Sequence, residues 1–417
     1  MLVMRRNVGL YNLHLRAMGG GEKLTLALAE HLSAGHNVWL FYSEPLDVAL
    51  LEQFFGVDLS RVRFVPLEPG GRLLRHMAGV RGWRVPDFSL HHYLQLKKFN
   101  LDLFINNSYA SGLACPAQCG IYMCMFPHHP TPHHPTRSLP RRAGDALVDR
   151  FEQRLTGYAV RDVYDSYSTI AAISGYSAEW FGKFWGRRPE IIFPLCEDMG
   201  PSVASAKRKR ILHVGRFIAD LGGKEYHHKG QGVLLEAFKG MTGLHRDGWE
   251  LHFAGSVGVD EESAKYTAAL VESAKGFPVR FHMKAGLGEL RDLYRTAAIY
   301  WHATGFGYPA SDYPAKQEHF GITTVEAMSA GAVPVVYGSG GQKEVVTHGV
   351  DGLCWDDTSG LVSQTLSLIG DPDLRGRLSR QAVTSSRRFG REAFAASVDR
   401  LVGRLMSGHP AQTSGDS

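Results

Sequence analysis

Two glutamates and the segment between them contain residue types that bind phosphate groups and sugar hydroxyls. Seven residues separate Glu318 from Glu326, and the sequence from Thr323 onward predicts a helix, so Glu326 lies about one turn inside it. Gly321 would let the backbone approach a ligand closely, and the free amides of Ile322, Thr323 and Thr324 can bind a phosphate at the positive helix end. Glu326 can accept two hydroxyls, as from a ribose. An amphipathic helix with two solvated glutamates is the alternative, and the glycine and threonines between them favour a binding site.

Two cations upstream could face such a diphosphate. Arg216 follows a predicted strand end, and Lys229 opens a predicted helix that begins at Gly230. A cation at a helix N-terminus is electrostatically unfavourable, so a bound anion explains Lys229 better than a solvated side chain does. Both cations would neutralise the charge that grows on a departing diphosphate. The connection 218–228 is long, however, and it leaves Lys224 as an alternative to Lys229.

The first half of the chain offers a glycine turn. Gly19, Gly20 and Gly21 precede a helix predicted from about Glu22. Such a turn could approach the same diphosphate through the helix N-terminus. A plain turn between a strand and a helix is an equally good interpretation.

Histidines and cysteines were considered as metal ligands. His128, His129, His133 and His134 follow a predicted strand, but prolines hold this segment extended and no acidic ligands accompany them. The spacing of the cysteines at 115, 119 and 124 does not match a zinc motif, and five cysteines cannot all pair. The sequence therefore predicts no metal site and buried free thiols in a reducing compartment.

The elements that would position these residues alternate between strand and helix, which indicates parallel sheets with crossover helices. We expect an α/β fold of two Rossmann-like, doubly wound domains that face each other across a cleft, with ligands at the carboxyl ends of the strands. Strands are predicted at 7–12, 38–42, 62–66, 101–106, 120–126 and 170–174, and then at 211–215, 250–254, 279–282, 299–302 and 333–337. Helices include 145–167, 176–185, 374–388 and 392–406.

Polar breaks suggest the domain boundaries. We expect an N-terminal domain at 1–195, on the acceptor side, and a C-terminal donor-binding domain at 206–389. The helix at about 390–406 is a candidate to pack back onto the first domain, and 407–417 is expected to be a disordered tail. The loop 305–317 is a candidate lid.

Composition excludes some classes of protein. The chain has 44% hydrophobic and 21% charged residues, as soluble globular proteins do, and a net charge of +5 fits phosphate-bearing ligands. No apolar run has the length of a membrane helix, and no secretory signal begins the chain, so we expect a cytoplasmic protein. The basic stretch 72–84 leaves peripheral contact with the cytoplasmic membrane face as an alternative. Nothing points to nucleic acid.

The segments 318–326, 326–336 and 340–344 resemble the donor-site signature of family 4 glycosyltransferases, which have the GT-B fold. The similarity extends to Gly215–Phe217, Lys229–Gly230 and the glycine turn. It implies that Glu318 lies against the donor sugar, that Glu326 binds the nucleotide ribose, and that an Arg and a Lys, here Arg216 and Lys229, bind the diphosphate.

The resemblance implies further expectations about the first half and the reaction. Relatives place a histidine near the reacting sugar after the fifth strand, where His128 matches best and His129 competes. Relatives often carry a glycine turn at Gly20 and Gly21, and GT-B enzymes generally need no metal. The segments around Glu22 and 106–109 look similar to the branch of mannosyltransferases that builds lipid-linked oligosaccharides.

We therefore expect a retaining, metal-independent hexosyltransferase with no cofactor. Its substrate would be a nucleotide-diphosphate sugar, with GDP-mannose favoured over a UDP-sugar. Its acceptor would carry a hydroxyl, on a lipid-linked saccharide or on a small molecule. Two other classes remain as alternatives, namely a nucleotide-sugar epimerase of the same fold and a non-catalytic sugar-nucleotide-binding protein.

Overall fold

The computed structural model describes residues 5–68, 88–128, 150, 153–154, 156–157, 160–200, 207–220 and 228–408. The chain divides into two compact units. The first comprises Met1–Ile173, Ser177–Ile192 and Ala395–Ser417, and the second comprises Ser174–Tyr176 and Phe193–Phe394. We had expected domains at 1–195 and 206–389.

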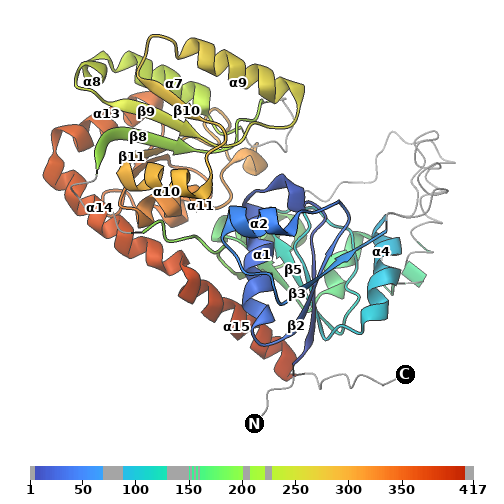
Figure 1. Cartoon of the computed structure of the whole chain (residues 1–417). Coiled ribbons are helices and arrows are strands. Elements are labelled where there is room, and N and C mark those ends of the chain that lie inside the picture. Colours follow the sequence, from blue (N-terminus) through green and yellow to red (C-terminus); the bar gives the residue numbers. More distant parts are fainter. Residues whose placement is uncertain are drawn as a thin grey trace. The chain divides into compact units, whose positions relative to one another are not determined.

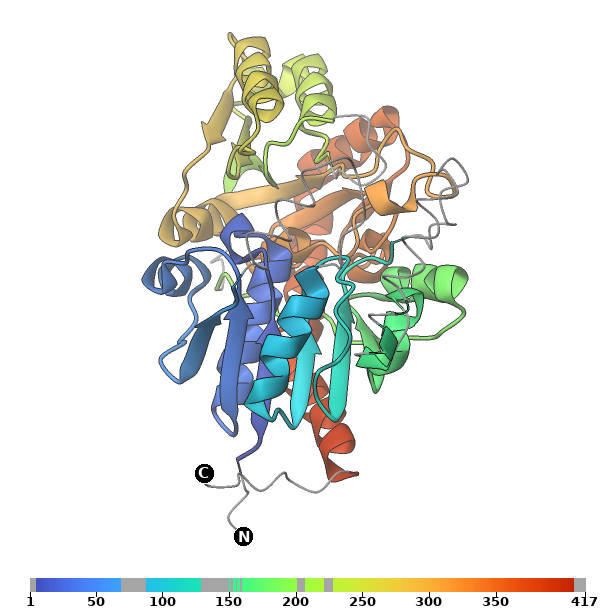
Figure 2. The same cartoon turned by 90° about the vertical axis from the view of Figure 1, so that its right-hand side faces the viewer.

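The first unit contains a seven-stranded parallel sheet with the strand order β3-β2-β1-β4-β5-β6-β7 (Figure 2). The order reverses between β1 and β4, which is the switch point of a doubly wound fold. The strands are β1 Asn7–Tyr11, β2 Asn37–Tyr42, β3 Val62–Pro66, β4 Leu103–Asn106, β5 Cys119–Cys124, β6 Thr169–Ala172 and β7 Glu190–Ile191. The helices are α1 Gly20–Ser33, α2 Val48–Phe55, α4 Phe88–Leu96 and α6 Gly175–Trp185, whose first two residues belong to the second unit.

The second unit contains a six-stranded parallel sheet with the order β10-β9-β8-β11-β12-β13, and its switch point lies between β8 and β11 (Figure 1). Its strands are β8 Arg208–Val214, β9 Glu250–Ala254, β10 Val279–His282, β11 Ala297–His302, β12 Val333–Tyr337 and β13 Leu353–Trp355. Its helices are α7 Gln231–Gly240, α8 Thr242–Arg246, α9 Glu261–Ser273, α10 Leu287–Thr296, α11 Ile322–Ser329, α12 Gln342–Val345, α13 Thr358–Gly370 and α14 Pro372–Ser386.

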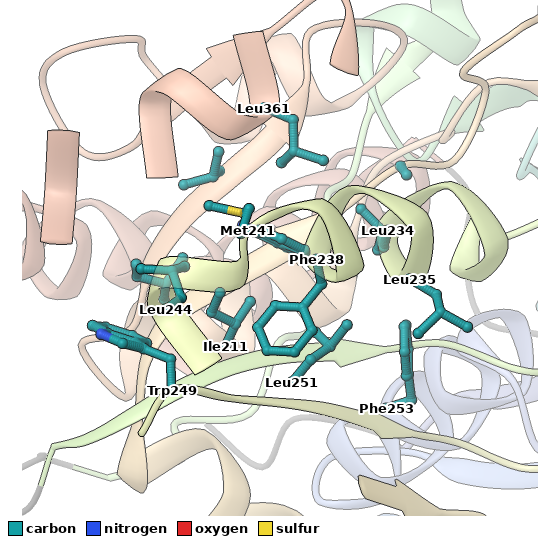
Figure 3. Packing of buried hydrophobic residues seen from close by; sticks show 14 of the residues in the cluster. Ile211, Leu234, Leu235, Phe238, Met241, Leu244, Trp249, Leu251, Phe253 and Leu361 are labelled. Carbon is teal, nitrogen blue, oxygen red and sulfur yellow. The ribbon is translucent and has the colours of Figure 1, made fainter. Parts of the chain in front are cut away.

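Helices cover both faces of the second sheet. On one face, Leu234 and Phe238 of α7 pack over Leu251 and Phe253 of β9, and Figure 3 shows this layer of buried side chains. On the other face, α10 and α11 bury Tyr294, Ala327 and Ala330 against β8 and β11. Strands covered on both faces are mostly apolar, and the central strands β11 and β12 accordingly consist almost entirely of buried apolar residues.

Most predicted strands occur within three residues of their expected limits, and the differences have local causes. Helix α1 begins at Gly20, not at Glu22, because the Glu22 carboxylate accepts the Gly19 amide at 2.7 Å and caps the helix. Strand β8 begins at Arg208, not at 211. The basic run before it is compatible with a strand because the Lys207 ammonium donates to the carbonyl of Ala297 at 2.7 Å.

The predicted helix 145–167 lies partly outside the described residues, and its described end, Val160–Ser166, is a 3-10 helix. The basic stretch 72–84 and the tail from 409 also lie outside them. The last helix, α15 Arg391–Ser407, begins in the second unit and belongs to the first from Ala395.

The prediction of free thiols is confirmed. All five cysteines are unpaired, four of them are buried, and burial raises the pKa of Cys115 to about 12. Across the described ranges, none of the helices combines the length and the apolar character needed to cross a membrane.

Candidate functional site

The switch point of the second sheet gathers several of the predicted residues. Strands β8 and β11 are neighbours, with Tyr300 paired to Leu212, so their carboxyl ends lie at the same edge. Arg216 follows β8, and His302 is the last residue of β11. In doubly wound sheets the crevice outside this edge is where ligands bind.

The Glu318 carboxylate is the centre of a group of polar side chains at this edge. Its Oε2 accepts a hydrogen bond from Lys229 Nζ at 2.8 Å and one from His302 Nε2 at 3.0 Å. Burial alone would raise the pKa of Glu318, but the Lys229 ammonium and the His302 hydrogen bond outweigh it and hold that pKa well below 4.5. Glu318 is therefore an ionised acceptor.

Two neutral histidines lie at the ends of the strands that carry this group. Burial lowers the pKa of His302 below 6.5, although Glu318 acts in the opposite direction. Burial also lowers the pKa of His213, on β8, to about 3, and His213 Nδ1 lies 3.0 Å from the Trp301 carbonyl oxygen. The positive charge beside Glu318 therefore comes from Lys229 and not from the imidazoles.

Lys229 is held beside the strand end by the turn that follows it. Helix α7 begins at Gln231, one residue later than expected, after Gly230 with a φ of 71°. A Cβ at Gly230 would lie 2.7 Å from Ala303 Cβ, so only glycine permits this approach to the end of β11. The expected pair of cations is thus unequal, because Lys229 is already paired with a carboxylate.

Arg216 is exposed at the end of β8, and its guanidinium has no partner among the described residues. Its backbone is fixed, because the Arg216 carbonyl accepts Gln231 Nε2 at 3.0 Å. The alternative cation, Lys224, lies outside the described residues. Arg216 is thus a free positive charge on an anchored backbone at the switch point.

The entry to α11 presents free amides. Gly321 precedes the helix with a φ of 109°, and its carbonyl accepts the amides of Thr324 and Val325. The amides of Ile322 and Thr323 have no acceptor within the described part of the chain. A helix start with open N–H groups attracts anions. The glycine itself is required by more than a ligand, because a Cβ there would lie 2.4 Å from Gln342 Nε2.

Glu326 lies deeper on the same helix. Its side chain is buried, and its Oε2 accepts the Tyr294 hydroxyl at 3.1 Å. Tyr294 is on α10, so the carboxylate is oriented by a neighbouring helix. One short element thus carries the free amides and the buried Glu326, and Glu318 lies just before it.

The segment Gly340–Glu344 supports that element from the other side. The Gly341 amide donates to the Glu318 carbonyl at 2.7 Å, and a Cβ at Gly340 would lie 2.3 Å from the same oxygen. The Glu344 carboxylate accepts the amides of Gly175 and Tyr176 at 2.7 and 2.6 Å. These residues fix the backbone around Glu318.

The loop before Glu318, a predicted lid, has well-defined internal contacts. Gly305 and Gly307, at the start of this loop, have φ values of 92° and 87°. The buried Gln317 side chain donates to the carbonyls of Tyr308 and Tyr313 at 2.8 and 3.3 Å. The loop is therefore braced from within in this conformation.

The predicted glycines of the first unit lie in the first turn of α1. A Cβ at Gly21 would lie 2.6 Å from Met125 Sδ, and the Gly21 carbonyl accepts Asn107 Nδ2 at 2.9 Å. Asn107 also donates to Thr25 Oγ1 at 2.7 Å. Close packing within the unit therefore accounts for Gly21, and Gly20 is helical rather than part of a flexible turn.

His128 is half-buried after β5. Its Nδ1 lies 3.3 Å from the Tyr164 hydroxyl, and its carbonyl accepts Trp185 Nε1 at 3.1 Å. The competing His129, and His133 and His134, lie outside the described residues. His128 and the glycines belong to the first unit, whereas Glu318 and the residues grouped with it belong to the second.

Two functional candidates were missed at the level of sequence. His302 had been noted only as a strand end, and Tyr294 had not been singled out. The position of His302 at the end of a buried strand was a usable signal, since ligands bind at that edge. No local pattern identifies Tyr294. A search of the described residues finds no cluster of His, Cys, Asp or Glu that could hold a metal ion.

Comparison with known proteins identifies similar sequences. Residues 197–384 match the family model described as "Glycosyl transferases group 1". The chain is 32% identical over 120 residues to D-inositol 3-phosphate glycosyltransferase of Thermobispora bispora, which covers 28% of this chain and 26% of that protein. It is 26% identical over 300 residues to human alpha-1,3/1,6-mannosyltransferase ALG2, which covers 69% of this chain and 68% of that protein.

A further match covers a smaller part of a longer relative. The chain is 25% identical over 179 residues to GDP-Man:Man(3)GlcNAc(2)-PP-Dol alpha-1,2-mannosyltransferase of Yarrowia lipolytica. That match covers 39% of this chain and 25% of the relative. The chain thus spans about a quarter of the length of two of these three curated relatives.

Solved structures show the same fold. Anabaena HepE, in complex with UDP and glucose, superposes with a TM-score of 0.66 at 15% identity, over 96% of this chain and all of that one. WaaG, a glycosyltransferase involved in lipopolysaccharide biosynthesis, superposes with a TM-score of 0.60 at 14% identity, over 95% and 100%. The two Rossmann-like sheets are therefore those of a GT-B fold, as predicted.

Proposed function

We propose that this protein transfers a hexosyl group from a nucleotide-diphosphate sugar to a hydroxyl acceptor. The premise is that residues 197–384 form a glycosyl transferases group 1 domain within a GT-B fold. The observation that carries the proposal is the arrangement around α11. An ionised Glu318, two free amides and a buried Glu326 lie along one element at the switch point. A sugar, a diphosphate and a ribose need these three kinds of partner.

The proposed roles follow from the charges. The amides of Ile322 and Thr323 and the exposed Arg216 bind the diphosphate, and Lys229 adds its charge beside Glu318. Glu318 accepts hydrogen bonds from the sugar, and Glu326 accepts them from the ribose. His128, Gly20 and Gly21 are assigned to the acceptor side and the diphosphate on the resemblance alone. Because protein cations and amides neutralise the phosphates, the proposal includes no metal and no cofactor.

The reaction proposed is transfer with retention. The bond between C1 of the sugar and the β-phosphate oxygen breaks, and the acceptor oxygen bonds to C1 on the same face. The acceptor proton passes to the departing phosphate oxygen, which is the strongest base released in the step. Arg216 and the helix amides stabilise the charge that develops on this oxygen, where such stabilisation lowers the barrier most.

GDP-mannose is the proposed donor. The names of two relatives specify mannosyl transfer, and one of them names GDP-Man. The UDP-bound structure of HepE supports a UDP-sugar as the competing choice. Lipid-linked saccharides are the first acceptors to test, because that same relative's name includes a PP-Dol acceptor.

The test measures nucleotide release and product formation with GDP-mannose, UDP-glucose and UDP-N-acetylglucosamine, with and without EDTA. We expect transfer from GDP-mannose at a rate that EDTA does not change, and an axial C1 configuration in both donor and product. Arg216→Ala should lower kcat about a hundredfold while the Kd for GDP changes less. Isomerisation of the donor without any acceptor would instead indicate an epimerase. Nucleotide binding without turnover of any donor would indicate a binding protein.

A further inference from the structure

The two protein donors to Glu318 meet at the same oxygen. Lys229 Nζ and His302 Nε2 both contact Oε2, at 2.8 and 3.0 Å, and Oε1 has no partner among the described residues. The Glu318 side chain is 17% exposed, while that of His302 is 1% exposed. The protein thus holds the carboxylate through Oε2, and Oε1 stays available to a ligand.

The hydrogen-bond pattern fixes the protonation state of His302. An ionised carboxylate only accepts hydrogen bonds, so His302 Nε2 must carry the proton that points to Oε2. His302 Nδ1 is buried and has no hydrogen-bond partner in the described part of the chain. A second proton on the ring would place an unpaired N–H donor there, whereas a bare lone pair is tolerated more easily. The geometry therefore favours a neutral ring with its hydrogen on Nε2.

Thr304 helps to hold this ring. Its hydroxyl oxygen is buried and lies 3.1 Å from His302 Nε2, so the N–H is shared between the carboxylate and the hydroxyl. His302 ends β11, a strand that is buried along its whole length and paired with a strand on each side, so its ring is carried by the centre of the sheet. A donor fixed in this way can orient Glu318 without adding charge to the site.

We propose that His302 is a positioning residue that holds Glu318 through Oε2, so that Oε1 faces a hydroxyl of the donor sugar. The inference rests on the proposed transfer function and assigns to that site a residue that does not itself touch the sugar. A neutral donor is suited to this task, because it orients the carboxylate without adding a second positive charge beside Lys229. The expected substrate is a sugar with at least one hydroxyl that can donate to a carboxylate.

Three variants separate positioning from packing. Glutamine can place its amide nitrogen near the position of His302 Nε2, whereas asparagine reaches only as far as Nδ1. His302→Asn should therefore lower kcat for sugar transfer about tenfold or more and leave the Kd for GDP within twofold, and His302→Gln should recover most of the loss. His252→Asn is the control: His252 is a buried histidine of β9 that contacts Glu250 and His282 and does not belong to the group around Glu318. It should retain wild-type turnover at pH 7.5.

A double-mutant cycle tests whether His302 acts through Glu318. Glu318→Gln should lower kcat strongly, and His302→Asn should then add less than a twofold effect, because the carboxylate that it orients is already absent. Three outcomes would each overturn the assignment. They are kcat losses that multiply in the double variant, a wild-type kcat in His302→Asn, and equal kcat losses in His302→Gln and His302→Asn.

A measurement that needs no activity separates this inference from the proposed function. The pKa of the Glu318 carboxyl can be followed by 13C NMR of glutamate-labelled protein, with Glu318→Gln supplying the assignment. His302→Asn should raise this pKa, because a hydrogen bond to the charged form is lost. In an active enzyme the acid limb of kcat/KM should move to higher pH in parallel. An unchanged Glu318 pKa would refute the positioning role, whereas a raised pKa in a chain without transfer activity would refute only the proposed function.

Discussion

Glu326 is more deeply buried than Glu318 and is assigned to the nucleotide, so its role is tested by nucleotide affinity and not by turnover. It is buried, its Oε2 accepts one hydroxyl, from Tyr294, and it lies on α11 where a ribose would meet it. Glu326→Gln should weaken GDP binding about tenfold to a hundredfold, since a charged acceptor is lost, whereas Tyr294→Phe should have a smaller effect. Isothermal titration calorimetry of both variants checks this. Equal affinity in Glu326→Gln and wild type would remove Glu326 from the nucleotide site.

His213 makes the stability of the second unit depend on pH. Burial, with a smaller contribution from Lys229, lowers its pKa to about 3, and the hydrogen bond to the Trp301 carbonyl and the Glu318 charge only partly oppose this. Below about pH 6.5 the His213 side chain binds a proton in the unfolded chain but stays neutral in the folded chain. The free energy of unfolding should therefore fall as the pH is lowered, by up to about 1.4 kcal/mol per pH unit from this group.

The variant His213→Asn removes this titration and keeps the donor to the Trp301 carbonyl. Urea denaturation between pH 7.5 and 4.5 should show a shallower loss of stability than in the wild type. Other buried histidines titrate equally in both proteins, so the difference between the two curves isolates His213. Parallel curves would show that His213 is not neutral in the folded protein.

Residue types and local spacing were enough to single out Glu318, Glu326 and Arg216 as candidates. They were not enough to find Tyr294, which meets Glu326 from a helix 32 residues earlier in the sequence. The pairing of Lys229 with Glu318 was also missed, since 89 residues separate them. Such contacts depend on which strands and helices become neighbours, and the sequence pattern indicates an element's type more directly than its neighbours.

At the scale of elements, the start of α11 depends on a glycine turn packed against its backbone. Gly340 has a φ of 60°, and a Cβ there would lie 2.3 Å from the Glu318 carbonyl oxygen. Gly349 has a φ of 76° with nothing within 4 Å of an added Cβ, so Gly349→Ala measures the cost of the left-handed backbone alone, about 1–2 kcal/mol. Gly340→Ala should cost more than this, because the backbone of the Glu318 segment must also move.

The comparison of these two variants has two readouts. Urea denaturation gives the difference in unfolding free energy, and calorimetry with GDP shows whether the shifted segment still presents its amides. We expect Gly340→Ala to weaken GDP binding and Gly349→Ala to leave it unchanged. Equal stability and equal binding in both variants would mean that the turn tolerates the clash and does not set the position of α11.

The ends of helices and strands could be predicted where a hydrophobic run defines them. They were predicted less accurately where a polar contact defines them. Strands β9 and β12 begin and end at the predicted residues, because both faces of each strand are covered. Helix α1 starts two residues early through a side-chain cap, and β8 starts three residues early through a buried lysine. Such polar contacts satisfy backbone groups that a hydrophobic pattern does not register.

At the scale of the whole molecule, the last helix links the two units along the chain. The alternation of strands and helices predicted two doubly wound domains, and the sequence also made the last helix a candidate to pack back onto the first. From Ala395 onward α15 belongs to the first unit, where Asp399 contacts His31 at 2.7 Å and the Leu405 carbonyl lies 3.6 Å from Cys119 Sγ. The first unit is therefore completed by residues from the far end of the sequence.

This arrangement predicts that a core change in α15 destabilises the first unit. Leu401 is 3% exposed, so Leu401→Ala should cost about 2–4 kcal/mol, whereas Arg400→Ala, one residue away on the exposed face, should cost less than about 0.5 kcal/mol. Hydrogen exchange resolves the location of the effect, because local stability is read amide by amide. Faster exchange is expected in β1 and α1, with β8 and β9 less affected. If β8 and β9 were the strands that lost protection, the C-terminal half of α15 would belong functionally to the second unit, and the division of the chain at Ala395 would be wrong.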